Sequence, residues 1–220
     1  MIKARDLIKT YNTGNIETQV LKGVNVDINN GEFVAIMGRS GAGKSTLLYQ
    51  LSLLDRPTSG TIEINGQNIL ELNSEQRVRF RLENLGYVFQ DYALMPELTA
   101  WENVAIVLIM QNRNKNEAKK LAIQALEKVG LGERVNNLPN QLSGGEQQRV
   151  SIARAIAHSP KIIFADEPTA NLDTETSEKI LQIFLNLNKQ GQTIVMVTHE
   201  PEYAEAAGRI IKVVDGRISS

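Results

Sequence analysis

The sequence predicts an α/β fold with a mostly parallel sheet, a small antiparallel sheet near the N-terminus and an inserted helical region. Three short apolar runs predict the parallel sheet, because such runs are typical of strands that helices cover on both faces. Each of these runs ends in a polar turn: Phe33–Met37, Ile162–Ala165 and Ile194–Val197. Amphipathic helical patterns lie between them, for example the apolar spacing that follows Asp173 and stops before Gly191.

The first third of the chain predicts the antiparallel sheet. Here β-prone pieces such as Val24–Ile28 and Thr61–Ile64 are separated by Asn-Asn-Gly and Asn-Gly turns. From about 91 to 157 helical patterns dominate, including one with a predicted N-cap at Asn116 and a stop at Gly130. We therefore expect one unit, 1–220, in which about 1–90 and 158–220 form the core with its β-subdomain and about 91–157 form a helical subdomain.

Composition excludes several classes of protein. The 24 Lys and Arg residues and 25 Asp and Glu residues leave a net charge of −1, so we expect no nucleic-acid partner that depends on bulk positive charge. The chain has no cysteine, which excludes disulfides and cysteine-based zinc sites. Two histidines, His158 and His199, argue against a histidine-rich metal site.

The apolar segments predict a polypeptide without a membrane span. No segment approaches the ~20 apolar residues that cross a bilayer, and the longest run, Val104–Met110, fits a buried helix. The first residues lack the apolar region of a signal peptide. We expect a cytoplasmic chain that reaches a membrane only through a partner.

One glycine-rich segment predicts a phosphate-binding loop. It matches G-x-x-x-x-G-K-[ST], follows the predicted strand Phe33–Met37 and leads into an apolar helical stretch, which is the context the motif requires. Its backbone N–H groups and the following helix N-terminus favour phosphate oxygens, Lys44 can reach the β- and γ-phosphates, and Ser45 can bind Mg²⁺. The sequence thus predicts a P-loop NTPase core whose nucleotide contacts come from Gly38, Arg39, Ser40, Gly41, Ala42, Gly43, Lys44, Ser45 and Thr46.

A GTPase would also carry a P-loop. The segment Asn114-Lys115-Asn116-Glu117 resembles the base-recognition motif N-K-x-D of GTPases, but it ends in Glu and follows no buried strand. We interpret it as a loop and helix N-cap.

Two carboxylates follow the predicted strand Ile162–Ala165. A carboxylate at this end of a buried parallel strand lies at the ligand edge of the sheet, so Asp166 is suited to hold Mg²⁺. Because successive side chains diverge, Glu167 can point toward the water that attacks the γ-phosphate. Adjacent carboxylates at strand ends are also common as solvated turn residues, and the P-loop favours the catalytic interpretation.

The run Leu142-Ser143-Gly144-Gly145-Glu146-Gln147-Gln148-Arg149 points to a family. Together with the P-loop and the acidic strand end, it closely resembles the signature of ATP-binding-cassette (ABC) ATPases. The same residues form a capping box, and a helix start of this kind is an anion site. The resemblance implies that Ser143, Gly144 and Gly145 bind the γ-phosphate of ATP held by a second copy of the chain.

Other positions match the family individually. Gln90 resembles the glutamine that senses Mg²⁺ and the attacking water, and His199 the switch histidine at the γ-phosphate. Asp173, in a segment that resembles the D-loop, is also a plausible N-cap. Tyr11 resembles the aromatic residue that stacks on adenine. The resemblance implies catalytic roles for Glu167, His199, Gln90 and Lys44, and metal binding by Ser45, Gln90 and Asp166.

The resemblance implies an ATP- and Mg²⁺-dependent ATPase that pairs with a second copy of itself and drives a separate transmembrane permease. The chain is then peripheral on the inner face of the cell membrane. The segment Tyr92–Val104 is where a permease helix would dock, although its Leu94, Met95 and Trp101 fit a helical core as well. The sequence around this segment is similar to that of the cassettes of lipoprotein release, macrolide export and cell division. Two alternatives stay open: a soluble ABC-type ATPase without a permease, as in iron–sulfur assembly, and a cell-division mechanotransmitter.

Overall fold

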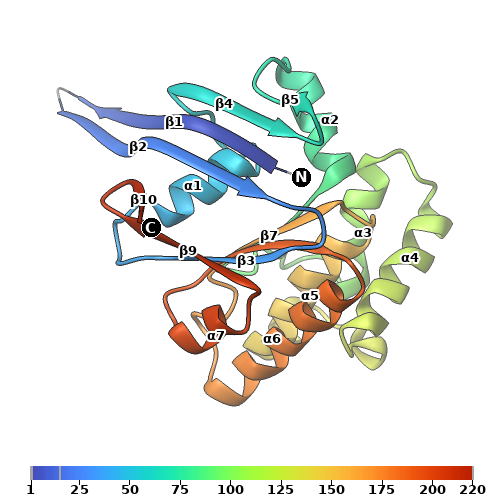
Figure 1. Ribbon diagram of the computed structural model, residues 1–220. Helices are drawn as coiled ribbons and strands as arrows, with labels where there is room; N and C mark the ends of the chain where they lie inside the picture. The colour runs from blue at the N-terminus through green and yellow to red at the C-terminus, as the bar shows by residue number, and fades with distance from the viewer. Residues whose placement is uncertain (1, 15, 220) are drawn as a thin grey trace.

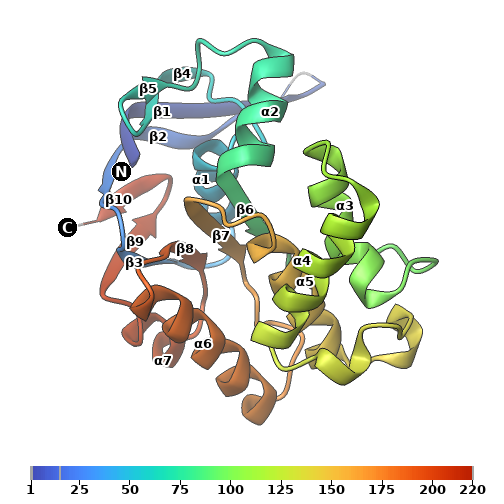
Figure 2. The same ribbon diagram turned by 90° about the vertical axis from the view of Figure 1, so that its right-hand side faces the viewer.

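Residues 2–14 and 16–219 are described by the computed structural model, so the outermost residues of the predicted unit 1–220 lie outside the described residues. The elements build two sheets with helices beside them (Figures 1 and 2). A four-stranded sheet has the order β2-β1-β4-β5, and a six-stranded sheet has the order β10-β9-β3-β8-β7-β6. The predicted α/β fold with both kinds of sheet is confirmed.

The six-stranded sheet is parallel except at one edge. Its strands are β3 (Phe33–Met37), β6 (Leu85–Val88), β7 (Ile162–Asp166), β8 (Thr193–Val197), β9 (Arg209–Val214) and β10 (Arg217–Ser219). Strands β6, β7, β8, β3 and β9 pair in parallel, and β10 closes the edge in an antiparallel hairpin with β9. Strands β7 and β8 are buried along their whole length, as their continuous apolar runs predict.

The antiparallel sheet is larger than the sequence predicted. It consists of β1 (Ile2–Thr13), β2 (Ile16–Ile28), β4 (Ser59–Ile64) and the short β5 (Gln67–Asn68). The predicted piece Val24–Ile28 is only the end of β2, because the earlier half of that strand is largely exposed and carries no apolar alternation. The sheet lies above the parallel sheet, and α1 (Lys44–Leu51) contacts both (Figure 1).

The helices divide between two places. Helices α3 (Ala100–Met110), α4 (Lys115–Lys128) and α5 (Gly144–Ile156) gather at one end of the molecule, with short turns η1 (Gly132–Arg134) and η2 (Pro139–Gln141) between α4 and α5 (Figure 2). Helices α6 (Thr174–Lys189) and α7 (Pro201–Glu205) lie on the side of the parallel sheet away from the antiparallel sheet (Figure 1). In the part of the chain that the structure describes, no helix is both long and apolar enough to cross a membrane.

Three details differ from the expectations. Helix α4 is capped by Asn114, whose side chain accepts a hydrogen bond from the Glu117 N–H at 2.9 Å, so the predicted cap at Asn116 is wrong by two positions. Helix α2 (Ser74–Asn84) was not predicted, because none of its side chains is fully buried, although Asn73 and Gln76 form a capping box at its start. The apolar run Val104–Met110 is only partly buried in the core. Val104 is buried, whereas Met110 at the helix end is 57% exposed.

Candidate active site

The P-loop connects β3 to α1 as predicted. Gly43 has φ +101°, a conformation that glycine adopts without strain, and it occupies the N-cap position of α1. No side chain among the described residues caps this helix. Its first N–H groups therefore face the loop without a partner from a cap and form an anion-binding end.

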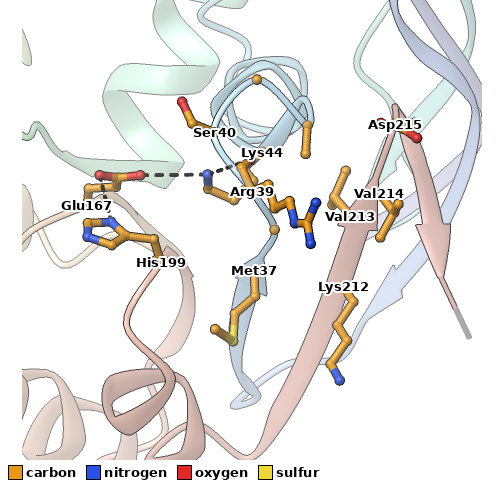
Figure 3. A pocket seen from close by; sticks show the side chains of 13 residues that line it. Met37, Arg39, Ser40, Lys44, Glu167, His199, Lys212, Val213, Val214 and Asp215 are labelled. Atoms are coloured by element: carbon orange, nitrogen blue, oxygen red, sulfur yellow. Dashed lines mark hydrogen bonds and ion pairs between the residues drawn. The ribbon is translucent and has the colours of Figure 1, made fainter.

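An open cleft of about 1160 Å³ lies over the P-loop. Figure 3 shows Glu167 and His199 on one side of the loop and the β9–β10 hairpin on the other. Gly38 is where the loop meets this hairpin, since a Cβ there would come within 2.3 Å of the Val213 carbonyl oxygen. The lining residues are Met37, Gly38, Arg39, Ser40, Gly41, Ala42, Lys44, Glu167, His199, Lys212, Val213, Val214 and Asp215.

Lys44, Glu167 and His199 converge in this cleft. The Lys44 ammonium donates to the Arg39 carbonyl oxygen at 3.3 Å and lies 3.9 Å from Glu167 Oε1. The other carboxylate oxygen, Oε2, is 3.2 Å from His199 Nδ1. Glu167 has φ +43°, which is unusual for a residue with a side chain and turns the backbone directly after β7. Lys44 and His199, which are far apart in the sequence, thus flank the carboxylate of Glu167.

Asp166 points in a different direction. It ends β7, is only 6% exposed and accepts a hydrogen bond from Ser45 Oγ at 3.0 Å. Burial raises the pKa of Asp166, and hydrogen bonds from Ser45 and Tyr49 act in the opposite direction. The carboxylate and hydroxyl oxygens are the donor types that Mg²⁺ prefers, so this pair fits the metal. The two adjacent carboxylates diverge as the sequence predicted.

Several predicted nucleotide-site residues do not line the cleft: Gly43, Ser45 and Thr46 lie beside it at the start of α1, and Tyr11 and Gln90 lie on other elements. Tyr11, near the end of β1, is 39% exposed and donates its hydroxyl to Asp55 Oδ2 at 2.9 Å. Gln90 lies in an exposed turn after β6, where its carbonyl oxygen accepts a hydrogen bond from Asn171 Nδ2 at 3.3 Å. Neither residue contacts the Lys44–Glu167–His199 group by a hydrogen bond in the described part of the chain.

The signature residues form the start of α5. Ser143 is the N-cap, and its reciprocal hydrogen bonds with Glu146 complete the predicted capping box. Gly144 faces the Tyr92 hydroxyl, and Gly145 packs against Thr176 near the start of α6. Asp173 is the N-cap of α6 and accepts from the Thr176 N–H at 2.9 Å. None of these residues lines the cleft over the P-loop of the same chain.

The segment after Gln90 is held by polar side chains. The buried Asn103 exchanges hydrogen bonds with the Met95 backbone, accepting from its N–H at 2.7 Å and donating to its carbonyl at 3.0 Å. Arg154 on α5 donates to the Tyr92 carbonyl oxygen at 2.9 Å. Trp101 is 9% exposed and belongs to the helical core, while Met95 is 50% exposed. Among the described residues of this segment, Met95 is the large apolar side chain that is exposed, while Leu94 is partly buried against the helical core.

Sequence reasoning missed three groups at the site. Tyr49 lies near Asp166, and its position four residues after Ser45 on one helix face was an available signal. Burial raises the pKa of Tyr49 to about 12, and the Asp166 charge adds to this effect. Gln148 is fully buried and donates to the Pro168 carbonyl oxygen at 2.8 Å, which ties α5 to the segment after Glu167. The hairpin residues of the cleft had no local signal, because only the pairing of β9 with β3 brings them there.

The chain is similar to several known proteins over most of its length. The ABC transporter family profile matches residues 21–170. An uncharacterized ABC transporter ATP-binding protein of Methanocaldococcus jannaschii is 49% identical over 218 residues, covering 99% of this chain and 97% of that protein. The lipoprotein-releasing system ATP-binding protein LolD of Aquifex aeolicus is 46% identical over 200 residues, covering 91% of this chain and 89% of that protein.

Longer relatives and a solved structure match as well. The macrolide export ATP-binding/permease protein MacB of Bdellovibrio bacteriovorus is 44% identical over 220 residues; the match covers 100% of this chain but 34% of that protein. The dimeric ATP-binding cassette MJ0796, in a post-hydrolysis state bound to ADP and Pi, is 44% identical with a TM-score of 0.93 and covers 100% of this chain and 97% of that chain. The chain therefore belongs to the ABC transporter family, as an ATP-binding cassette with ATPase activity.

Proposed function

We propose that this cassette hydrolyses ATP as one of two identical subunits that power a separate membrane permease. The convergence of Lys44, Glu167 and His199 in one cleft over the P-loop carries the proposal. The printed names of the relatives support its transport side, since one belongs to a lipoprotein-releasing system and another combines ATP-binding and permease functions.

The chemistry is assigned to this chain's own side chains. Glu167 orients the attacking water and accepts its proton, while His199, 3.2 Å away, fixes the direction of the carboxylate and contacts the γ-phosphate. Lys44 stabilises the charge on the β- and γ-phosphates. Ser45 and Asp166 would hold Mg²⁺, with Gln90 completing the site from its exposed turn, and when bound the metal neutralises phosphate charge. Tyr11 stacks on the adenine base.

The second subunit completes each site. Ser143, Gly144 and Gly145 present an N-terminal helix end that lies outside the cleft of their own chain. In the proposed dimer this end contacts the γ-phosphate held by the partner, and Asp173 lies in the segment that crosses the interface. ATP then acts as an adhesive between two chains, and hydrolysis separates them.

The permease docks on the segment after Gln90, where Met95 is exposed, and holds the cassette at the inner face of the membrane. The relatives favour a permease of the lipoprotein-release or macrolide-export type. The alternatives are a soluble ATPase without a permease and a cell-division mechanotransmitter. Purification of the tagged chain tests the first alternative: recovery with a four-span membrane protein supports a permease, whereas recovery with a soluble scaffold contradicts it.

The decisive variant for hydrolysis is Glu167→Gln. Loss of the base should slow hydrolysis roughly 10²–10⁴-fold and leave ATP binding intact. The variant should accumulate as an ATP-dependent dimer in size-exclusion chromatography, and adding Ser143→Arg should abolish that dimer. Glu127→Gln, an exposed carboxylate change on α4, is the matched control. A Glu167→Gln chain that stays monomeric at saturating Mg-ATP contradicts the two-chain site.

A further inference from the structure

Tyr11 is held in a defined orientation although it lies on the surface. It is near the end of β1, and its residue surface is 39% exposed. The Lys9 ammonium group lies 4.7 Å from the centroid of the ring, so a cation–π contact covers part of one face. Because the ring is partly exposed, the hydrogen bond of its hydroxyl group adds a restraint on its orientation.

The restraint is Asp55. Its Oδ2 accepts the Tyr11 hydroxyl at 2.9 Å and the Gln50 side-chain amide at 3.1 Å, and its Oδ1 accepts from the Arg56 N–H at 2.7 Å. The Lys9 ammonium lies 2.7 Å from Oδ2, and the Lys9 side chain is 12% exposed. Partial burial acts to raise the pKa of Asp55, but these hydrogen bonds outweigh it and lower the pKa below its usual value. One ionised carboxylate thus connects four donors.

Asp55 in turn is fixed to the P-loop helix. Its backbone N–H donates to the Tyr49 carbonyl oxygen at 3.1 Å, at the end of α1. Gln50 belongs to α1 and is fully buried, so its side chain cannot move independently of that helix. The β1 strand and the phosphate-binding helix are therefore joined through the carboxylate rather than through the chain, which separates Tyr11 from Asp55 by 44 residues.

We propose that Asp55 is a positioning residue for the nucleotide base. It holds the Tyr11 ring at a fixed distance from the P-loop, so that one nucleotide can place its base on the ring and its phosphates in the loop. The inference rests on the proposed role of Tyr11 as the base-stacking residue. Asp55 contacts no part of the ligand and acts through Tyr11. Its contribution is preorganisation, because a ring already in place loses less freedom when the base binds.

The test compares a ligand that has a base with one that lacks it. Equilibrium binding of ATP and of inorganic tripolyphosphate is measured for the unchanged chain and for Asp55→Asn, Tyr11→Phe and Tyr11→Ala. Asp55→Asn and Tyr11→Phe should each weaken ATP binding about 3- to 10-fold, and Tyr11→Ala should weaken it more. All three should bind tripolyphosphate like the unchanged chain, because the P-loop is not altered. In steady state, Asp55→Asn should raise KM for ATP at constant kcat.

Coupling and controls separate the outcomes. The double variant Tyr11→Phe with Asp55→Asn should bind ATP no more weakly than Tyr11→Phe alone, because Tyr11→Phe already removes the hydrogen bond through which Asp55 acts. Asp27→Asn breaks the exposed ion pair with Arg5 in the same sheet and should leave both ligands unaffected. If Asp55→Asn weakens tripolyphosphate as much as ATP, or weakens neither, the positioning role is overturned. If Tyr11→Ala leaves ATP binding unchanged, the proposed role of Tyr11 itself is wrong.

Discussion

The chain contains two glycine-containing helix starts suited to phosphate, and they are built differently. Helix α1 has Gly43 at its N-cap position, which offers no side chain, and no described side chain accepts its first N–H groups. Helix α5 has Ser143 at its N-cap position, and the side chains of Ser143 and Glu146 form a complete capping box. The first start lies in a cleft with Lys44, Glu167 and His199. The second lies beside α6, outside that cleft.

The difference teaches how much each start depends on a ligand. An uncapped helix end leaves N–H groups that a triphosphate can satisfy, and a nearby lysine adds charge. A capped end is stable without a ligand. Its serine hydroxyl and the positive end of the helix dipole can still bind an anion that another chain holds. This is the arrangement expected if the second start completes a partner's site. The variants below test the contrast, from the largest expected effect to the smallest.

Lys44→Met tests the start of α1. Removing the ammonium should lower kcat/KM for ATP about 10²–10³-fold, because a charge that is preorganised toward the phosphates is lost. Folding stability should not fall, since the Lys44 side chain is 8% exposed and its nearest carboxylate oxygen is 3.9 Å away. Steady-state kinetics and thermal unfolding measure the two quantities, with Lys120→Met on the exposed side of α4 as control. A large loss of stability would show that Lys44 is chiefly structural.

Ser143→Asp separates the two functions of the second start. Aspartate caps a helix as well as serine does, so stability should be retained. Its negative charge should repel a phosphate, so ATP-dependent dimerisation should disappear and hydrolysis should fall about 10²-fold.

Ser143→Ala is the variant to compare with Ser143→Asp, because it changes stability rather than charge. It loses the cap and about 1 kcal/mol of stability but adds no charge. The two variants are compared by size-exclusion chromatography and chemical denaturation. Unchanged hydrolysis in Ser143→Asp would remove the anion-binding role from α5.

Gly145→Ala tests how closely α5 must approach α6. A Cβ at this position would lie 2.2 Å from Thr176 Cγ2, so the two helices must separate, at a cost of about 1–3 kcal/mol in the free energy of unfolding. Thr176→Ser removes that methyl group and keeps the hydroxyl that donates to Asp173 Oδ2 at 2.7 Å. The double variant should therefore regain most of the lost stability in urea denaturation. Without such recovery, the requirement for glycine arises from the ligand side rather than from packing.

The smallest expected effect lies away from both helix starts. His158 donates through Nε2 to the Leu85 carbonyl oxygen at 3.1 Å, and its Nδ1 is buried without a partner in the described structure. Burial lowers the pKa of His158, while the Leu85 hydrogen bond acts in the opposite direction.

The consequence is a pH-dependent stability. Below the ordinary histidine pKa of about 6.5, His158 binds a proton in the unfolded chain but stays neutral in the folded chain. The free energy of unfolding should therefore fall as the pH decreases from that value toward the folded pKa. His158→Gln, which can still donate to Leu85, should reduce this slope in denaturation series and leave ATP binding unchanged. An identical slope in both chains would assign the pH dependence to other groups.

Elements with a local pattern were predictable. Strand β3 has the predicted bounds, and β7 and β8 differ from the predicted runs by one residue each, because unbroken apolar sequence has one stable place in a covered sheet. Helix α2 was missed since it buries no side chain and so shows no apolar period. The cap of α4 was misplaced because Asn114 and Asn116 are equally good caps by sequence. Propensity alone does not distinguish two such asparagines.

The sequence by itself determined which chemistry is present: a glycine-rich loop after a strand, two carboxylates at a strand end, and a serine cap on a glycine-containing helix. These are local patterns, and local geometry follows from neighbouring residues. Only the tertiary structure decided which groups meet. The pairs Ser45 with Asp166, Glu167 with His199 and Tyr11 with Asp55 are separated by 121, 32 and 44 residues. Such contacts arise from strand order and packing, because a parallel sheet brings the ends of strands distant in sequence to one edge.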